Sequence, residues 1–292
     1  MKNHNCNCCK CRECCCGCCE CCCGRCVCVC QCPPPCPPKP PLPPKPPCPP
    51  KPPKPPKPEP KPIPTSVTDI DNNVYQVKRF GNILWMAENL RVTRYDTESP
   101  LSGDTIAAAT YNHTVDIGKP YYIDARDFEE LPYTESLTNE IRNSLGFLYN
   151  WSAAAGVAAN NTGVKDSIQG ICPNGWRLPC SKDFNSLFYY LGGQEVAGQK
   201  LKSMYGWYTQ SGSGTNESRL NCYPAGSAAN NFVLLVGKQT MFWSTTIPIG
   251  DITRAVTLKL FYDKEEAETP NINKFQANSV RCVMDITNEY QK

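Results

Sequence analysis

The 292-residue sequence lacks any apolar run long enough to cross a membrane. Its longest apolar stretches, residues 153–159 and 232–236, are far shorter than the roughly 20 residues that a spanning helix needs. No apolar signal core follows Met1, because cysteines stand where Leu and Ala are expected. We therefore expect no transmembrane segment, and the sequence does not identify an export route.

Histidine is nearly absent, and the two residues present are His4 and His113. His113 lies in a polar, loop-like context, where a lone histidine is more often structural or solvated than catalytic. The paired carboxylates Glu129-Glu130 and Glu265-Glu266 are adjacent in polar runs, and no nucleophile-elbow motif is present. No set of residues meets the needs of acid–base or nucleophilic catalysis. We therefore expect neither enzymatic activity nor a cofactor.

Cysteine and proline are abundant but unevenly spread. Residues 1–64 hold 18 of the 22 Cys and 21 of the 29 Pro, whereas all five Trp come later. This break predicts a Cys-rich low-complexity segment over residues 1–32, a proline stalk over residues 33–64 and one globular domain over residues 65–292.

Charge divides in the same way. Residues 1–66 carry ten Lys or Arg against three Asp or Glu, a net charge of +7. The remaining residues carry 20 against 24, a net charge of −4, so the globular part is mildly acidic. The overall charge of +3 is an average of two unlike parts and does not predict a nucleic-acid partner.

The Cys-rich segment has too few apolar residues to form a hydrophobic core, so its order must come from sulfur chemistry. Three interpretations remain open. Disulfides within and between chains would make it a cross-linked anchor and allow self-association. Thiolates at close spacing would bind Zn²⁺ or Cu⁺ as in a metallothionein. S-acylation would attach it to a membrane. The candidate metal ligands are Cys6, Cys8, Cys9, Cys11, Cys14, Cys15 and Cys16.

The proline stalk is predicted to be a polyproline II helix, because proline fixes φ and supplies no N–H. Its Cys, Leu and Lys residues recur at multiples of three, which lines them along one edge of a helix with three residues per turn. At about 3.1 Å per residue the stalk would hold its ends roughly 100 Å apart. It is therefore a stiff spacer, with a ligand for a proline-recognising domain as the alternative.

Periodicity in the globular part predicts short helices between strands. Two strands around an Asp-Asn-Asn turn are expected over residues 67–77, and a buried strand over residues 83–86. Phe184, Leu187, Phe188 and Leu191 recur at helical spacing after a cap at Ser181. A second helix is expected near residues 195–204, and further strands over residues 232–236, 241–245, 254–262 and 279–284. This order indicates an α+β domain.

Several blocks of sequence resemble one known family. They include Asp69-Ile70-Asp71-Asn72-Asn73-Val74-Tyr75, Trp85-Met86-Ala87-Glu88-Asn89-Leu90-Arg91, Leu148-Tyr149-Asn150-Trp151, Gly170-Ile171-Cys172-Pro173-Asn174-Gly175-Trp176-Arg177-Leu178-Pro179 and Ser279-Val280-Arg281-Cys282-Val283. In these blocks the chain resembles the Fibrobacter succinogenes major paralogous domain over about residues 67–286. The resemblance implies a C-type lectin-like fold of short helices on twisted antiparallel sheets. It also implies a secreted or surface module without a defined reaction.

The same resemblance implies two disulfides. Cys172 and Cys282 match the family's two cysteine positions and are expected to pair. Cys180 and Cys222 depart from the family pattern, which suggests that they pair with each other. The alternative is four free buried thiols in a reducing compartment.

Ligand binding is expected on loops. The usual calcium motifs of C-type lectins are depleted here, since Thr269-Pro270-Asn271 lacks the acidic first residue and Trp243-Ser244-Thr245 lacks carboxylates. Polar loops over residues 210–218, 247–251 and 263–273 are the candidate sites, with nearby aromatic residues either stacking on a ligand or packed in the core. The candidate residues are Tyr208, Asn216, Glu217, Asp251, Asp263, Asn271 and Asn273.

Together these features predict a stalked display protein at a cell envelope or virion surface. The Cys-rich segment would anchor it, the stalk would project outward, and the domain would bind a protein or glycan. The alternative is a metal-thiolate protein in which the globular domain is only structural.

Overall fold

The computed structural model describes most of the globular domain, namely residues 61–96, 104–108, 119–126, 139–157, 167–229, 232–287 and Tyr290. The predicted Cys-rich segment with its candidate thiolates, residues 33–60 of the predicted proline stalk and His113 lie outside these residues. Within the described part, no helix is both long and apolar enough to span a membrane. Short helices and many strands alternate there, which confirms the predicted α+β class.

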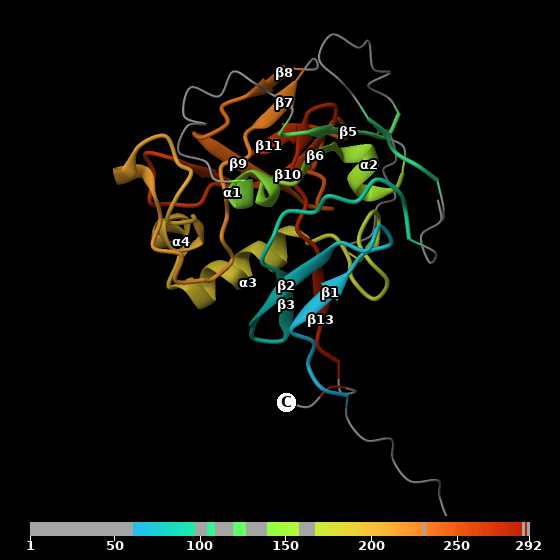
Figure 1. Ribbon diagram of the computed structural model, residues 1–292, viewed down its shortest axis with the longest axis horizontal. Coiled ribbons are helices and arrows are strands. Elements are labelled where there is room, and N and C mark those ends of the chain that lie inside the picture. Colours follow the sequence, from blue (N-terminus) through green and yellow to red (C-terminus); the bar gives the residue numbers. More distant parts are fainter. Residues whose placement is uncertain are drawn as a thin grey trace, which may run out of the picture. The chain divides into compact units, whose positions relative to one another are not determined.

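The strands that open and close the domain form one antiparallel sheet in the order β1-β2-β3-β13. They are β1 (Ser66–Thr68), β2 (Val74–Phe80), β3 (Ile83–Met86) and β13 (Val283–Asp285). The Asp69 carboxylate accepts the Asp71 and Asn73 N–H groups at 2.9 Å, which forms the predicted turn between β1 and β2. The ends of the described chain meet beside this sheet, where Lys61 bridges Tyr290 (Figure 1).

Two further sheets complete the strands of the described residues. One has the order β11-β10-β9 and consists of β9 (Gln239–Trp243), β10 (Arg254–Phe261) and β11 (Asn271–Asn273). The other has the order β4-β5-β6-β12-β7-β8, with β4 (Ala107–Ala108), β5 (Tyr121–Asp124), β6 (Phe147–Asn150), β7 (Ser227–Ala229), β8 (Phe232–Leu234) and β12 (Ala277–Asn278). Only the β4–β5 pairing in these two sheets is parallel.

The helices are α1 (Asn139–Ser144), α2 (Trp151–Ala155), α3 (Ser181–Leu191) and α4 (Gln194–Leu201), with a 3₁₀ turn at Gln210–Gly212. Helix α3 buries the four predicted apolar residues and ends at Gly192 in the left-handed region. Its N-cap is Cys180 rather than the predicted Ser181, because the Asp183 carboxylate accepts the Cys180 N–H at 2.7 Å. Helix α4 stops before the predicted Met204, which is exposed.

The core contains buried tryptophans that also make hydrogen bonds. Trp151 Nε1 donates to the Ser244 carbonyl at 3.0 Å, and Trp243 Nε1 donates to the Tyr149 carbonyl at 2.7 Å. A second cluster of buried apolar residues joins α3 and α4 to β10. Because the indole N–H groups are satisfied, these large side chains are buried without leaving a polar group unpaired.

Some predicted strands are shorter than expected. Strand β8 ends at Leu234 because Leu235 adopts φ 60°, a left-handed conformation that a strand cannot continue through. Over residues 279–284, only the last two belong to a strand, β13. Before it, Ser279 bridges Phe242 of β9, so the chain here passes from one sheet to another.

The cysteines of the domain form one disulfide. Cys172 and Cys282 are bonded with a Cα–Cα distance of 5.8 Å. The predicted Cys180–Cys222 disulfide is wrong, since both residues are free and buried. Cys180 caps α3, whereas Cys222 packs in the second core cluster, and its backbone bridges Lys202 after α4. The two thiols are therefore held by different parts of the fold.

Candidate ligand-binding site

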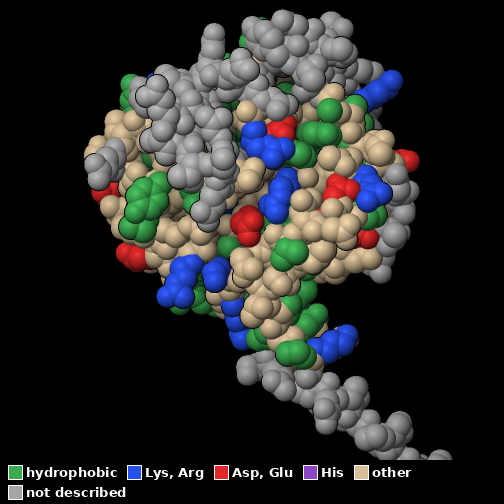
Figure 2. Space-filling view, viewed as in Figure 1, with side chains coloured by type: hydrophobic (Ala, Val, Ile, Leu, Met, Phe, Trp, Pro, Cys, Tyr) green, Lys and Arg blue, Asp and Glu red, His purple; other side chains and the backbone are tan. Residues whose placement is uncertain are grey.

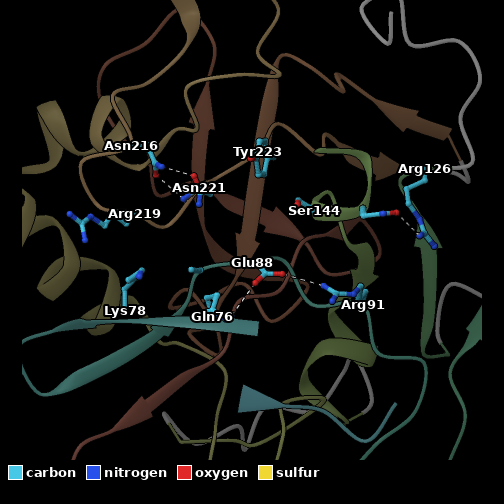
Figure 3. A pocket seen from close by; sticks show the side chains of 12 residues that line it. Gln76, Lys78, Glu88, Arg91, Arg126, Ser144, Asn216, Arg219, Asn221 and Tyr223 are labelled. Carbon is cyan, nitrogen blue, oxygen red and sulfur yellow. Dashed lines mark hydrogen bonds and ion pairs between the residues drawn. The ribbon is translucent and has the colours of Figure 1, made fainter. Parts of the chain in front are cut away.

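A cavity of about 710 Å³ lined mostly by polar side chains is the candidate site, and we call it the basic pocket. Figure 3 shows that β2 and the segment after β3 form one side and the loop over residues 216–223 another. The pocket is lined by Gln76, Lys78, Ala87, Glu88, Arg91, Arg126, Asn143, Ser144, Asn216, Arg219, Asn221 and Tyr223. Its size falls within the range of small-molecule sites.

Strand alternation explains the β2 side of the pocket. Tyr75 and Val77 are buried, so Gln76 and Lys78 point to the opposite face of the strand. The Gln76 N–H donates to Glu88 Oε1 at 3.0 Å, which ties β2 to the segment after β3. The alternation thus places an amide and an ammonium group at the pocket.

The loop over residues 216–221 is shaped by three left-handed residues. Asn216, Arg219 and Asn221 have φ values of 54°, 56° and 46°. Asparagine tolerates this conformation, whereas for arginine it is uncommon. The Asn216 and Asn221 side chains are hydrogen-bonded to each other, and Asn216 Oδ1 accepts the Asn221 N–H at 2.9 Å. These bonds fix the backbone that carries Arg219.

Arg281 supports the backbone of this loop from the protein interior. Its side chain is 2% exposed, and it donates Nη1 to the Leu220 carbonyl and Nη2 to the Asn221 carbonyl, the latter at 3.0 Å. Nε donates to Asn89 Oδ1 at 2.8 Å. Burial lowers the pKa of Arg281. The Arg281 guanidinium therefore donates its hydrogen bonds to Asn89 and to the loop backbone that supports the pocket, and not to groups inside the pocket.

Charges in the basic pocket are unbalanced. Four of its residues are Lys or Arg, whereas Glu88 is its single acidic residue. Arg91 pairs with Glu88 at 3.5 Å, and Arg126 pairs with Asp124 of β5. Within the described part of the chain, the side chains of Lys78 and Arg219 have no ion pair. The pocket therefore presents two cations that no carboxylate of the described residues neutralises.

A second polar cavity, of about 350 Å³, lies beside residues 261–265. Here Lys202 is 3% exposed, and its Nζ donates to the carbonyls of Phe261, Tyr262 and Lys264 at 2.9–3.3 Å. Burial is the main cause that lowers the pKa of Lys202, although Asp263 opposes it. The Lys202 ammonium group therefore stabilises the backbone of residues 261–264.

The residues that the sequence predicted as a ligand site do not come together. Asn216 lines the basic pocket, whereas its neighbour Glu217 pairs with Lys200 at 3.4 Å. Asp263 lines the second cavity, where the ring of Tyr208 contacts Tyr262.

The other three predicted residues lie elsewhere. Asp251 pairs with Arg254 at 3.3 Å and accepts hydrogen bonds from Thr253. Asn271 and Asn273 stand on β11, and Asn273 Oδ1 accepts the Phe275 N–H at 2.9 Å. The Asp251 and Asn273 side chains accept hydrogen bonds from residues two positions further along the chain, so each stabilises its own turn.

Lys78, Arg91, Arg126 and Arg219 were not predicted. Alternation along β2 was the available signal for Lys78, but nothing in the sequence connected it to Arg219. Across the parts of the domain that the structure describes, no group of three or more His, Cys, Asp or Glu residues could hold a metal ion.

The fold and the pocket together define a sheet-rich α+β domain with a polar cavity, in which Lys61 and Tyr290 bridge the two ends of the described chain. The Fibrobacter succinogenes major domain family matches residues 79–284 by its sequence profile, and the chain belongs to that family. Gln76 and Lys78 precede the matched residues, whereas the other residues that line the pocket lie within them. No curated protein matches the chain, and neither does any solved structure.

Proposed function

We propose that this chain is a non-enzymatic surface-display protein whose globular domain binds a glycan or protein ligand in the basic pocket. The observation that carries the proposal is the pocket itself. It combines amides and hydroxyls with two cations, Lys78 and Arg219, that no carboxylate of the described residues neutralises. Such convergent polar groups in a concave site favour recognition of a ligand.

A C-type lectin-like fold is part of the proposal. It is supported by short helices beside antiparallel sheets and by the long, largely irregular stretch from residue 202 to residue 226, which supplies one side of the pocket. Loops of this kind commonly carry binding residues on a rigid scaffold.

Anchoring through the Cys-rich segment and projection by the proline stalk complete the proposal. A disulfide between Cys172 and Cys282 is compatible with an oxidising, extracellular setting. In that setting the many cysteines of residues 1–32 would cross-link chains at a cell envelope or virion surface, and the stalk would hold the domain away from it.

A glycan and protein-ligand screen with the full chain tests the binding part. We expect retention by the folded chain, with or without calcium, that is lost after heat unfolding. Failure of the folded chain to retain any ligand would contradict the proposal.

Mass spectrometry of native material under non-reducing conditions tests the anchor. We expect disulfides between chains. Stoichiometric Zn or Cu on a chain without such disulfides would favour a metallothionein-like protein, and acyl adducts would favour membrane attachment.

A further inference from the structure

The charge of the basic pocket narrows the chemistry of its ligand. We infer that the pocket recognises an acidic saccharide, one that carries carboxylate or sulfate groups on its sugar rings. This inference rests on the proposed function, because it assumes that the pocket is the binding site.

Lys78 and Arg219 provide the charge complement. Both line the pocket and neither has an ion pair within the described residues, whereas Glu88 is already engaged by Gln76 and Arg91. An anionic group placed between them would gain charge-assisted hydrogen bonds without having to displace a carboxylate of the described residues. A neutral ligand would leave both cations with water alone.

The neutral groups of the pocket fit the hydroxyls of a sugar. Amides and hydroxyls both donate and accept, as sugar hydroxyls do. They come from Gln76, Asn143, Ser144, Asn216, Asn221 and Tyr223. The pocket thus offers hydrogen bonds around a site for negative charge, which is the combination that an acidic sugar ring presents.

Other classes of anionic partner fit less well. Nucleic acids favour broad basic surfaces with stacking aromatics. The globular part has a net charge of −4, and on the face drawn in Figure 2 the Lys and Arg side chains form separate small groups rather than one continuous basic surface. Protein interfaces have an apolar centre, whereas none of the large exposed hydrophobic residues lines this pocket.

The loop is fixed before any ligand arrives. Arg281 binds the carbonyls of Leu220 and Asn221 on the inner side, while the Arg219 and Asn221 side chains line the pocket. A pre-arranged loop lowers the entropy lost on binding. The recognition of an anion therefore does not require a rearrangement of this part of the backbone.

Calorimetric titration of the full chain with three oligosaccharides of matched length tests the inference. The probes are an oligogalacturonate, a sulfated dextran oligosaccharide and a neutral dextran oligosaccharide, so that carboxylate and sulfate sources are separated. The pocket variants are Lys78→Met and Arg219→Gln. The matched controls are Lys238→Met and Arg254→Gln, which remove cations outside the pocket.

We expect at least one acidic probe to bind and the neutral probe to bind far more weakly. Each pocket variant should weaken acidic binding about tenfold, and the controls should leave it unchanged. Added salt should weaken it because both cations are accessible to solvent. Thermal unfolding should show that all four variants remain folded.

Equal binding of neutral and acidic probes, or acidic binding that is insensitive to both pocket variants, would overturn the inference and leave the proposed function standing. If neither of the two acidic probes binds, the inference is also overturned. The proposed function fails separately if the folded chain retains nothing in the broader ligand screen.

Discussion

Two neighbouring regions of the domain differ in whether their charged side chains have partners in the protein. In the closing segment, residues 279–285, Arg281 is buried and bonded to carbonyl and amide oxygens, and Asp285 pairs with Arg177 at 2.7 Å. In the basic pocket, Lys78 and Arg219 have no ion pair among the described residues. The two regions meet at residues 219–221.

The difference distinguishes charged residues that support the fold, which we call the frame, from charged residues that line the basic pocket. Charges that hold the fold have their hydrogen-bonding groups satisfied, because a buried charge without partners is costly. Charges at the pocket remain available, because solvent access makes an unpaired cation tolerable. We therefore expect variants of the closing segment to lower stability, and variants of the pocket to change binding with little effect on stability.

The largest effect is expected from the double variant Cys172→Ser, Cys282→Ser. The disulfide links residues 110 apart in sequence. Its loss should lower the free energy of unfolding by about 4 kcal/mol, since a long loop in the unfolded chain is no longer closed. Denaturant titration of oxidised wild type and variant measures this. An unchanged midpoint would show that the closing segment is held without the disulfide.

The next largest effect is expected from Arg281→Met. This change removes the donors to the Leu220 and Asn221 carbonyls and should cost about 3 kcal/mol of unfolding free energy. It should also weaken ligand binding, because the loop that carries Arg219 loses its support. The exposed Arg254→Met is the control and should lie within about 0.5 kcal/mol of wild type. Equal stability of the two variants would contradict a framing role for Arg281.

Lys202→Met sharpens the comparison between two lysines. It leaves three carbonyls near residues 261–264 without their ammonium donor and should lower stability by about 2 kcal/mol. Denaturant titration beside Lys78→Met checks the prediction. If Lys202→Met proves as stable as Lys78→Met, the buried and pocket lysines do not differ as described.

A further effect concerns pH. Lys274 is 1% exposed, and burial is the main cause that lowers its pKa to about 8. Between that pKa and the higher pKa of an unfolded lysine, the unfolded chain binds more protons, so stability should rise with pH. Above pH about 10 the buried Tyr121 opposes this rise, since burial raises its pKa to about 12.

Lys274→Met should flatten the rise in stability above pH about 8. Unfolding midpoints of wild type and variant across this pH range provide the measurement. A variant that keeps the slope of the wild type would show that another group titrates there.

The smallest stability effect is expected from Lys78→Met. Its side chain lines the pocket and has no ion pair in the described part of the chain, so stability should change by less than about 0.5 kcal/mol. Thermal unfolding measures this. A loss of stability as large as that of Arg281→Met would show that Lys78 supports the fold, which contradicts this prediction.

Local patterns predicted much of the fold. The spacing of Phe184, Leu187, Phe188 and Leu191 predicted α3, because one helical face repeats every three to four residues. The Asp-Asn-Asn turn was also predictable, since Asp69 bonds to backbone groups only a few residues away. The family match confirmed the resemblance read from the sequence blocks.

The basic pocket was not predictable in the same way. Lys78 and Arg219 are distant in sequence, and their proximity depends on Arg281, which fixes the loop through backbone carbonyls that carry no sequence signal. Only Asn216 among the predicted ligand residues lines this pocket. The Cys180–Cys222 pairing failed for a related reason, because a departure from a family pattern says nothing about which elements hold each thiol.

Covalent lysine footprinting of the full chain tests the central claim most directly. The chain is acetylated with and without whichever acidic oligosaccharide binds, and the modification of each lysine is followed by mass spectrometry. We predict that the ligand protects Lys78, while Lys238, outside the pocket, reacts at an unchanged rate. Equal modification of Lys78 with and without bound oligosaccharide would contradict the assignment of the basic pocket as the binding site.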